Sequence, residues 1–439
     1  MSSWPLNFES YLFACKKVLL ASLALISLCS KASTLDEAIE SAIKYDPGLA
    51  ISKLSLMAAD ENIAIAKSRL LPQINLQGAT NQLSQTTIQE LPGGGNSSRT
   101  FVGPSVNHQL VIRQALLRPK ELSALTVSSL QVEYMALKYR FDTEDLRSRV
   151  IFAWLELLAA KQVVAAWEAS MELTRESVNQ EINRYSKGDS TKDILAEMNG
   201  QAQNIYGNYL QAVEAFKVKK NIFNNLTKKQ TELNREDVIP LDIEEKFTEN
   251  ERLFFLRKIS EESIEVRMSK IQEAVQLERV KIAEAEHKPT LDITAAFNIA
   301  RNDATSTQGY QYKNKQIGIQ YAIPIYAGGG LAAGDKQALF SYQSSILESE
   351  VVTNRLFNDF DTNWSLLIGN SVRKKGLNEL FKAAEEQLMA TKRSYQLGVK
   401  TISDLASIQQ LHTRRLVDLI IISQDYYKAM YKIKKEIYK

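Results

Sequence analysis

The sequence contains one unit twice, and this internal duplication restricts the possible folds more than any other feature. Residues 70–77 (LLPQINLQ) align with residues 287–294 (HKPTLDIT), and the alignment extends without a gap into the segments that precede them. Pro72 falls on Pro289 in this alignment. A repeat of this size means that each structural element occurs in two equivalent places.

The repeat also predicts the domain organisation. Further along each copy, the motif Tyr185-Ser-Lys-Gly188 matches Tyr395-Gln-Leu-Gly398. We therefore expect a first repeat over residues 33–229, a linker rich in charged residues and asparagine over 230–252, and a second repeat over 253–439.

Each repeat is predicted to contain two strands. Past Pro72 and past Pro289 the apolar residues alternate with polar ones, which is typical of a strand with one apolar and one polar face. The clearest apolar series is Leu291, Ile293, Ala295, Phe297 and Ile299. The predicted strands are residues 72–88, 99–112, 289–302 and 311–326.

Long helices are predicted after the second strand of each repeat. The chain has no glycine between Gly103 and Gly188 and no proline between Pro119 and Pro240. Apolar residues recur there at threes and fours, as in coiled coils. The predicted helices are residues 35–70 (interrupted at Asp46-Pro47), 114–186, 190–228, 253–287, 331–397 and 401–437.

Residues 1–32 have the pattern of a secretory signal peptide. Two lysines precede a short apolar run at residues 18–28, and small residues follow it up to Ala32. Cleavage after Ala32 would remove both cysteines, Cys15 and Cys29, so that the mature chain would have neither a disulfide nor a thiolate site. The alternative is lipid attachment at Cys29, which the large leucine before it disfavours.

Composition and motifs argue against several function classes. A net charge of +3 without a basic stripe gives no reason to expect nucleic acid as a partner. The three histidines, His108, His287 and His412, are far apart and lack metal-ligand spacing. No catalytic or nucleotide-binding motif is present, so we expect no enzyme activity, no cofactor and no bound metal.

The strands pose a problem that one chain cannot solve in a membrane. Single-chain barrels need at least about eight strands, and an open sheet edge in lipid leaves unpaired backbone groups. Either the four strands form a sheet in water, or several chains combine their strands in one barrel.

Two motifs carry a resemblance to a known family. Ile323-Pro324-Ile325-Tyr326 with the glycines that follow it, and the segment of residues 395–405 (YQLGVKTISDL), resemble signatures of the TolC-like outer membrane efflux family. The strand-to-helix signature comprises Pro324, Tyr326, Gly328 and Gly329. The duplicated order of helices and strands resembles that family over nearly the whole mature chain.

The resemblance implies a mixed α and β membrane protein in the bacterial outer membrane. Three chains would form a 12-stranded β-barrel, continued by an α-helical coiled-coil tunnel that projects into the periplasm. The implied partners are two further copies of this chain, a periplasmic adaptor and an inner-membrane transporter driven by ATP or protons. The implied role is a passive exit duct for drug efflux or type I protein secretion.

The hairpins between the last two helices of each repeat contain the candidate functional residues. Gly188 and Gly398 suit a left-handed helix stop. The segments Ser190-Thr-Lys-Asp193 and Thr401-Ile-Ser-Asp404 then read as capping boxes for the next helix. In this interpretation both aspartates only cap, and the sequence alone does not decide between capping and a functional role.

The resemblance places these hairpins at the periplasmic mouth, where three copies of Asp404 would form an acidic ring that favours cations. A contact of Asp193 with Lys400 or Tyr395 is the candidate latch of the closed mouth, although one exposed pair contributes only about 0–1 kcal/mol. The remaining constriction candidates are Lys192 and Ser407. Relatives often have a second aspartate at the position of Ser407, which makes the ring weaker here.

The alternative from another class is a periplasmic coiled-coil adaptor or scaffold. Such a protein would share the export signal and the long helices. It would not need two equivalent pairs of alternating strands. The sequence does not separate drug efflux from protein secretion, and the resemblance of the motifs in the second repeat slightly favours secretion or general export.

Overall fold

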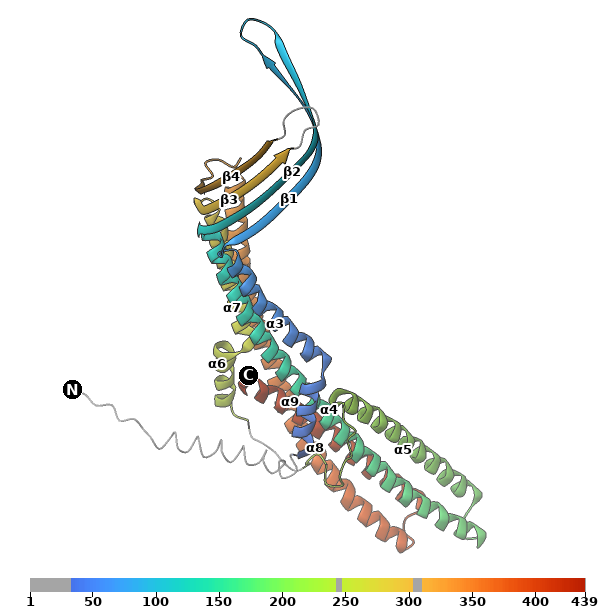
Figure 1. The fold of residues 1–439 in the computed structure, drawn as a ribbon. Helices are drawn as coiled ribbons and strands as arrows, with labels where there is room; N and C mark the ends of the chain where they lie inside the picture. Colours follow the sequence, from blue (N-terminus) through green and yellow to red (C-terminus); the bar gives the residue numbers. More distant parts are fainter. Residues whose placement is uncertain (1–32, 242–246, 303–309, 439) are drawn as a thin grey trace, which may run out of the picture. The chain divides into compact units, whose positions relative to one another are not determined.

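The structure is a computed structural model that describes residues 33–241, 247–302 and 310–438 and that divides into two structural units (Figure 1). Unit 1 comprises the described residues before 52 together with 140–263 and 354–438, and unit 2 comprises 52–139 and 264–353. The predicted signal peptide, including Cys29, lies outside the described residues. Two long helices, α4 (Pro119–Ser186) and α8 (Gly330–Gln396), contribute residues to both units.

Unit 2 contains one antiparallel sheet with the strand order β1-β2-β3-β4. The strands are β1 (Gln73–Glu90), β2 (Asn96–Leu117), β3 (Thr290–Asn302) and β4 (Tyr310–Ala322). The sheet is curled, and the hairpin of β1 and β2 extends beyond that of β3 and β4 (Figure 1). Because the first repeat supplies β1 and β2 and the second supplies β3 and β4, the pairing of β2 with β3 joins the two repeats.

The pairing register separates an apolar face of the sheet from a polar one. Ile74 pairs with Ile112, Ile112 with Ala295, and Ala295 with Ile317, so these four residues form one row on the same face. Rows with the same orientation include Leu76, Leu110, Phe297, Ile293 and Ile319. The side chain of Ile317 is 80% exposed and Leu76 is 74% exposed, so none of the described residues covers this face at either edge of the sheet.

The opposite face of the sheet is polar. The neighbouring row consists of Gln77, Gln109, Asn298 and Asn314, which pair in that order across the sheet. Arg113 and Asp292 lie on this face as well, because each is an even number of residues from a member of the row. A sheet with one exposed apolar and one polar face fits a wall between lipid and water.

Helices α3 (Pro47–Ser68) and α7 (Ile264–Ala285) precede the two hairpins of the sheet. α3 starts at the expected interruption, where the Asp46 carboxylate accepts a hydrogen bond of 2.8 Å from the Leu49 amide and Pro47 occupies the first helical position. In unit 2, the parts of α3 and α8 that adjoin the edge strands expose large apolar side chains: Leu54, Met57, Ile65, Phe340, Leu347 and Val351.

Unit 1 is a helical assembly that contains α2 (Ser33–Tyr45), α5 (Lys192–Thr227), α6 (Glu249–Glu262), α9 (Ile402–Tyr438) and the remaining parts of α4 and α8. The apolar series on α4 is buried here, with Leu146, Val150 and Leu157 fully inaccessible to solvent. Glu156 on the same helix accepts hydrogen bonds from Lys219 Nζ of α5 (2.7 Å) and Lys428 Nζ of α9 (2.6 Å). These contacts tie the last helix of each repeat to one carboxylate.

Several element boundaries differ from those expected from the sequence. The expected helix 253–287 is two helices, because the backbone of Ser263 (φ −58°, ψ 131°) leaves the helical region between α6 and α7. α6 begins inside the expected linker, where Thr248 and Glu251 form a capping box.

Both transitions from strand to long helix also differ. The expected strand 311–326 ends at Ala322, because Ala322 pairs with Thr290, the first residue of β3, and Pro324 follows. The expected helix 114–186 starts only at Pro119, because β2 continues to Leu117 and keeps pairing with β3 through an irregularity.

Candidate functional site

A charged cluster lies where the sheet of unit 2 meets α4. Asp292 on β3 is almost completely buried, with 4% of its side chain exposed. Its carboxylate accepts hydrogen bonds from Nε (2.8 Å) and Nη2 (2.5 Å) of Arg113, and from Nε (3.0 Å) and Nη2 (2.5 Å) of Arg118. One buried carboxylate therefore holds the end of β2 and the residue before α4 against the second repeat.

The equivalent positions of the other repeat do not contain a cluster of this kind. The ungapped alignment places Asn75 at the position of Asp292. Gln73 pairs with Arg113 in the first repeat, and Thr290, the equivalent of Gln73, pairs with Ala322 in the second. Ala322 is therefore the equivalent of Arg113. No arginine or lysine occurs from Ala322 to Asp335. Sequence reasoning missed the cluster, although Asp292, the one acidic residue within β3, was a signal.

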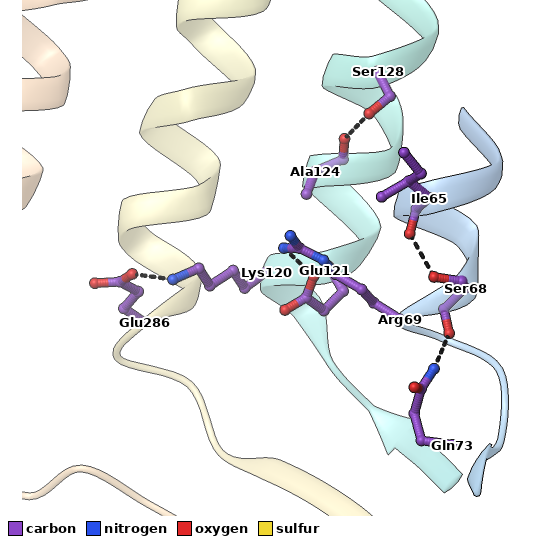
Figure 2. Close-up of polar contacts among 9 residues, drawn as sticks. All are labelled: Ile65, Ser68, Arg69, Gln73, Lys120, Glu121, Ala124, Ser128 and Glu286. Atoms are coloured by element: carbon purple, nitrogen blue, oxygen red, sulfur yellow. Dashed lines mark hydrogen bonds and ion pairs between the residues drawn. The ribbon is translucent and has the colours of Figure 1, made fainter. Parts of the chain in front are cut away.

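Further polar contacts surround the junction, as Figure 2 shows. Arg69 Nη1 lies 3.5 Å from Glu121 Oε2, which connects the turn after α3 with the first turn of α4. Lys120 Nζ donates to Glu286 Oε1 at 2.6 Å, and Gln73 Nε2 donates to the Ser68 carbonyl at 2.8 Å. The beginning of α4 is thus fixed to residues on both sides of it in unit 2.

The signature residues after β4 form an exposed connection to α8. Tyr326 is 87% exposed. Gly328 and Gly329 have positive φ angles of 61° and 82°, which favour glycine, and α8 begins at Gly330. Pro324 lies between β4 and these glycines, where no strand partner needs its missing N–H.

In unit 1, the candidate residues lie at the tips of two helical hairpins. Gly188 and Gly398 end α4 and α8 with φ angles of 82° and 73°. The first tip joins α4 to α5, and the second joins α8 to α9.

Asp404 caps α9. Its Oδ2 accepts hydrogen bonds from the backbone N–H (2.9 Å) and the hydroxyl (2.8 Å) of Thr401, and the Asp404 N–H donates to Thr401 Oγ1 at 3.1 Å. The hydrogen bonds from the Thr401 N–H and hydroxyl, together with the charge of Lys400, hold the pKa of Asp404 below its ordinary value. The residue therefore caps and carries a negative charge at neutral pH.

The first tip does not form the expected capping box. Thr191 is the N-cap of α5, and its side chain makes no capping hydrogen bond. The Ser190 hydroxyl donates to the buried carboxylate of Glu181 on α4 instead. Lys192 and Asp193 begin α5 as exposed residues. Only the second of the two expected boxes is present.

The two tips of one chain pack against each other by contacts that sequence reasoning missed. Ser403 Oγ donates to Glu197 Oε1 at 2.6 Å, which joins α9 to α5. Beneath this bond lies an apolar cluster of Met198, Ile402, Leu405 and Ala406, and Tyr395 packs against it. Among the described contacts of the chain, none joins Asp193 to Lys400 or Tyr395, and Ser407 is exposed.

Comparisons with known proteins show which family the chain is similar to. A sequence profile for the family described as "Outer membrane efflux protein" matches residues 256–430. The chain is 22% identical over 387 residues to the proteases secretion protein PrtF of Dickeya chrysanthemi, which covers 87% of this chain and 83% of that protein. It is also 22% identical over 412 residues to the outer membrane protein TolC of Vibrio cholerae, covering 91% of this chain and 88% of that protein.

These matches confirm the resemblance of the chain to the outer membrane efflux protein family. Solved structures of the same fold include the CmeC outer membrane channel of Campylobacter jejuni, with a TM-score of 0.74 and 16% identity over 92% of this chain and 85% of that one. The VceC outer membrane protein of Vibrio cholerae has a TM-score of 0.73 and 15% identity, over 92% of this chain and 96% of that one.

The similarity to outer membrane efflux proteins also confirms the predicted location in the outer membrane. The predicted class of mixed helices and strands also agrees with the fold, which combines long helices with one curled antiparallel sheet. The family consists of channels rather than enzymes, so that the expectation of a transport role agrees with it. The alternative of an adaptor or scaffold is not supported by any of these relatives.

Proposed function

We propose that three copies of this chain form an outer-membrane exit duct of a tripartite export system. The observation that carries this proposal is a four-stranded sheet with an exposed apolar face and two open edges. The duct is passive, and it serves type I protein secretion or drug efflux.

The open edges require a partner once the sheet is in lipid. β1 and β4 each pair on one side only, and unpaired backbone groups in hydrocarbon cost several kcal/mol each. Joining β4 of one copy to β1 of the next satisfies both edges. Three copies then give a closed barrel of 12 strands, which is within the known range of barrel sizes.

The apolar face is suitable for lipid contact. Along β3 it runs from Leu291 to Ile299, which at roughly 3.3 Å per residue is about 26 Å along the strand, or about 20 Å of height at a strand tilt of about 40°. Membrane barrels have an apolar band about 25 Å tall. Lys313 and Lys315 on β4 lie at the end of the series, where long side chains reach polar surroundings.

The exposed apolar side chains of unit 2 extend the argument to the helices. Met57 and Ile65 precede the edge strand β1, and Phe340 and Leu347 follow the edge strand β4. Neighbouring copies that join their edge strands would also bring these helical faces together. The proposed tunnel continues the barrel in this way, with helices from each of the three copies.

The partners are proposed from the relatives. PrtF and AprF are named for protease secretion, whereas BepC is named as an efflux protein. A duct of this kind is engaged by a periplasmic adaptor and an inner-membrane transporter. The periplasmic mouth consists of the hairpin tips, with Asp404 as its acidic ring and Asp193, Lys192, Lys400, Tyr395 and Ser407 around it.

Membrane extraction and electrophoresis test the assembly. The full chain should resist carbonate extraction and migrate as a detergent-stable trimer. Ile317→Asp should abolish both properties, because it places a charge on the lipid-facing side. Gln316→Asp, one residue away on the polar face, should retain them. A wild-type chain that is recovered as a water-soluble monomer would refute the proposed function.

A further inference from the structure

The junction in unit 2 contains a pocket that the proposed duct function does not explain. Its volume is about 240 Å³, and it lies between the end of α3, the start of β1 and the first turn of α4. Three arginines and two carboxylates line it: Arg69, Arg113, Arg118, Glu121 and Asp292. The pocket therefore contains one positive charge in excess.

The arginines keep hydrogen-bonding capacity toward the pocket. Asp292 accepts hydrogen bonds from the Nε and Nη2 groups of Arg113 and Arg118. These bonds use only part of each guanidinium, which has five N–H donors. Among the described contacts, the Nη1 groups of both arginines donate to no acceptor. The Arg113 side chain is 48% exposed, and that of Arg69 is 62% exposed with a contact of 3.5 Å to Glu121.

The sheet register determines which side of the barrel wall this pocket faces. Arg113 and Asp292 lie on the same face as Gln77, Gln109, Asn298 and Asn314. The apolar face is the one that meets lipid, so that this polar face meets the water inside the duct. Arginine rings favour anions in pores, and paired guanidinium groups match the oxygens of phosphate.

We propose that this pocket binds a multivalent oxyanion, such as a phosphate group, from the inside of the duct. The inference rests on the proposed function, because a closed trimer places three such pockets around one lumen. The excess positive charge then lies where the barrel meets the helices of unit 2. The duct selects for cations at its mouth and holds anionic groups at this junction.

Planar bilayers of phosphatidylcholine that contain the purified channel test the inference, with inorganic pyrophosphate as the probe. Pyrophosphate should reduce the single-channel current of the wild type. In Arg113→Gln, the concentration that halves the current should rise by about tenfold or more, because one charge-assisted hydrogen bond accounts for about that factor in affinity. Arg69→Gln, at the exposed rim of the pocket, should weaken the block in the same direction without disturbing the bonds to Asp292.

Lys120→Gln is the matched control, since it removes a positive charge at the same junction that does not line the pocket. It should leave the block unchanged. The inference would be overturned if pyrophosphate failed to block open channels or blocked those of all four proteins equally. The proposed function would not be affected by this result. A chain that forms no channels would overturn the proposed function and the inference with it. Loss of the block when phosphatidylglycerol is added would assign the pocket to a lipid headgroup and overturn its placement inside the duct.

Discussion

Arg118 and Asp292 face each other across the boundary between the two repeats and share two hydrogen bonds, of 3.0 Å (Nε to Oδ1) and 2.5 Å (Nη2 to Oδ2). Arg118 is the last residue before α4, and Asp292 is the third residue of β3. The contact fixes the point where a strand of the first repeat becomes a helix against a strand of the second repeat.

Replacing Asp292 by asparagine should destabilise the protein by about 1–3 kcal/mol, because two arginines lose the carboxylate that both of them contact. The measurement is the free energy of unfolding by urea in detergent micelles at neutral pH. Glu286→Gln is the control: it removes an exposed carboxylate that pairs with Lys120, and it should cost less than about 1 kcal/mol. Equal effects of the two substitutions would contradict a special role of Asp292.

Glu156 should make the stability of the helical unit depend on acid pH. Burial alone would raise the pKa of Glu156, but the hydrogen bonds from Lys219 and Lys428 outweigh burial and hold the pKa below its ordinary value. A lowered pKa in the folded state means that the stabilisation is present above the unfolded value of about 4.3, and is lost as the pH falls through the folded value.

The difference in unfolding free energy between wild type and Glu156→Gln should therefore be constant from about pH 7 to 5 and shrink below about pH 4.3. Chemical unfolding at a series of pH values measures it. Glu214→Gln removes an exposed carboxylate that pairs with Lys217 on the same helix, and it should change stability by less than about 1 kcal/mol. A difference for Glu156→Gln that stays constant down to pH 3 would rule out the linkage.

Asp404→Asn separates the two roles of this residue. Asparagine still accepts a hydrogen bond from the Thr401 N–H, so that the cap on α9 is retained while the charge is lost. The variant should show reduced cation selectivity and reduced block by multivalent cations in planar bilayers. Thr401→Ala removes the hydroxyl part of the cap without changing charge, and it should keep the selectivity of the wild type. Unchanged block in Asp404→Asn would reduce Asp404 to a capping residue.

Glycine-to-alanine substitutions should lower the stability of the protein at the hairpin tips and raise it within the helices. At Gly398 the φ angle is +73° and an added Cβ would meet no atom within 4 Å, so the cost is backbone strain of about 1–2 kcal/mol. At Gly207, within α5, an added Cβ would also meet no atom within 4 Å, and the φ angle is not positive. Alanine should therefore stabilise the protein by about 0.5–1 kcal/mol. Thermal unfolding followed by circular dichroism measures both, and destabilisation at Gly207 would disprove this reasoning.

The strands could be predicted from the sequence because apolar and polar residues alternate in their central parts. Leu291, Ile293 and Phe297 alternate with polar neighbours, and these residues lie in β3. The same alternation misled at Ile323 and Ile325. Those residues continue the pattern but not the strand, because β3 offers no partner beyond Thr290.

The charged junction could not be predicted, because its members are distant in sequence. Arg113 and Asp292 are 179 residues apart, and only the pairing of β2 with β3 brings them together. The contact between Ser403 and Glu197 is similar, since it depends on two hairpin tips that pack side by side. Local patterns predict helices, strands and caps, whereas contacts of this kind depend on the arrangement of the repeats.

The one-sided junction has a consequence for how such a duplicated chain evolves. A chain built from two first repeats would gather the arginines around Asn75 without a carboxylate, and one built from two second repeats would bury Asp292 next to Ala322 without a cation. After divergence, neither half can replace the other. A ring of six identical half-length subunits would contain either arginines without a carboxylate or a carboxylate without an arginine. Each half of the duplicated chain now supplies only one side of this buried ion pair.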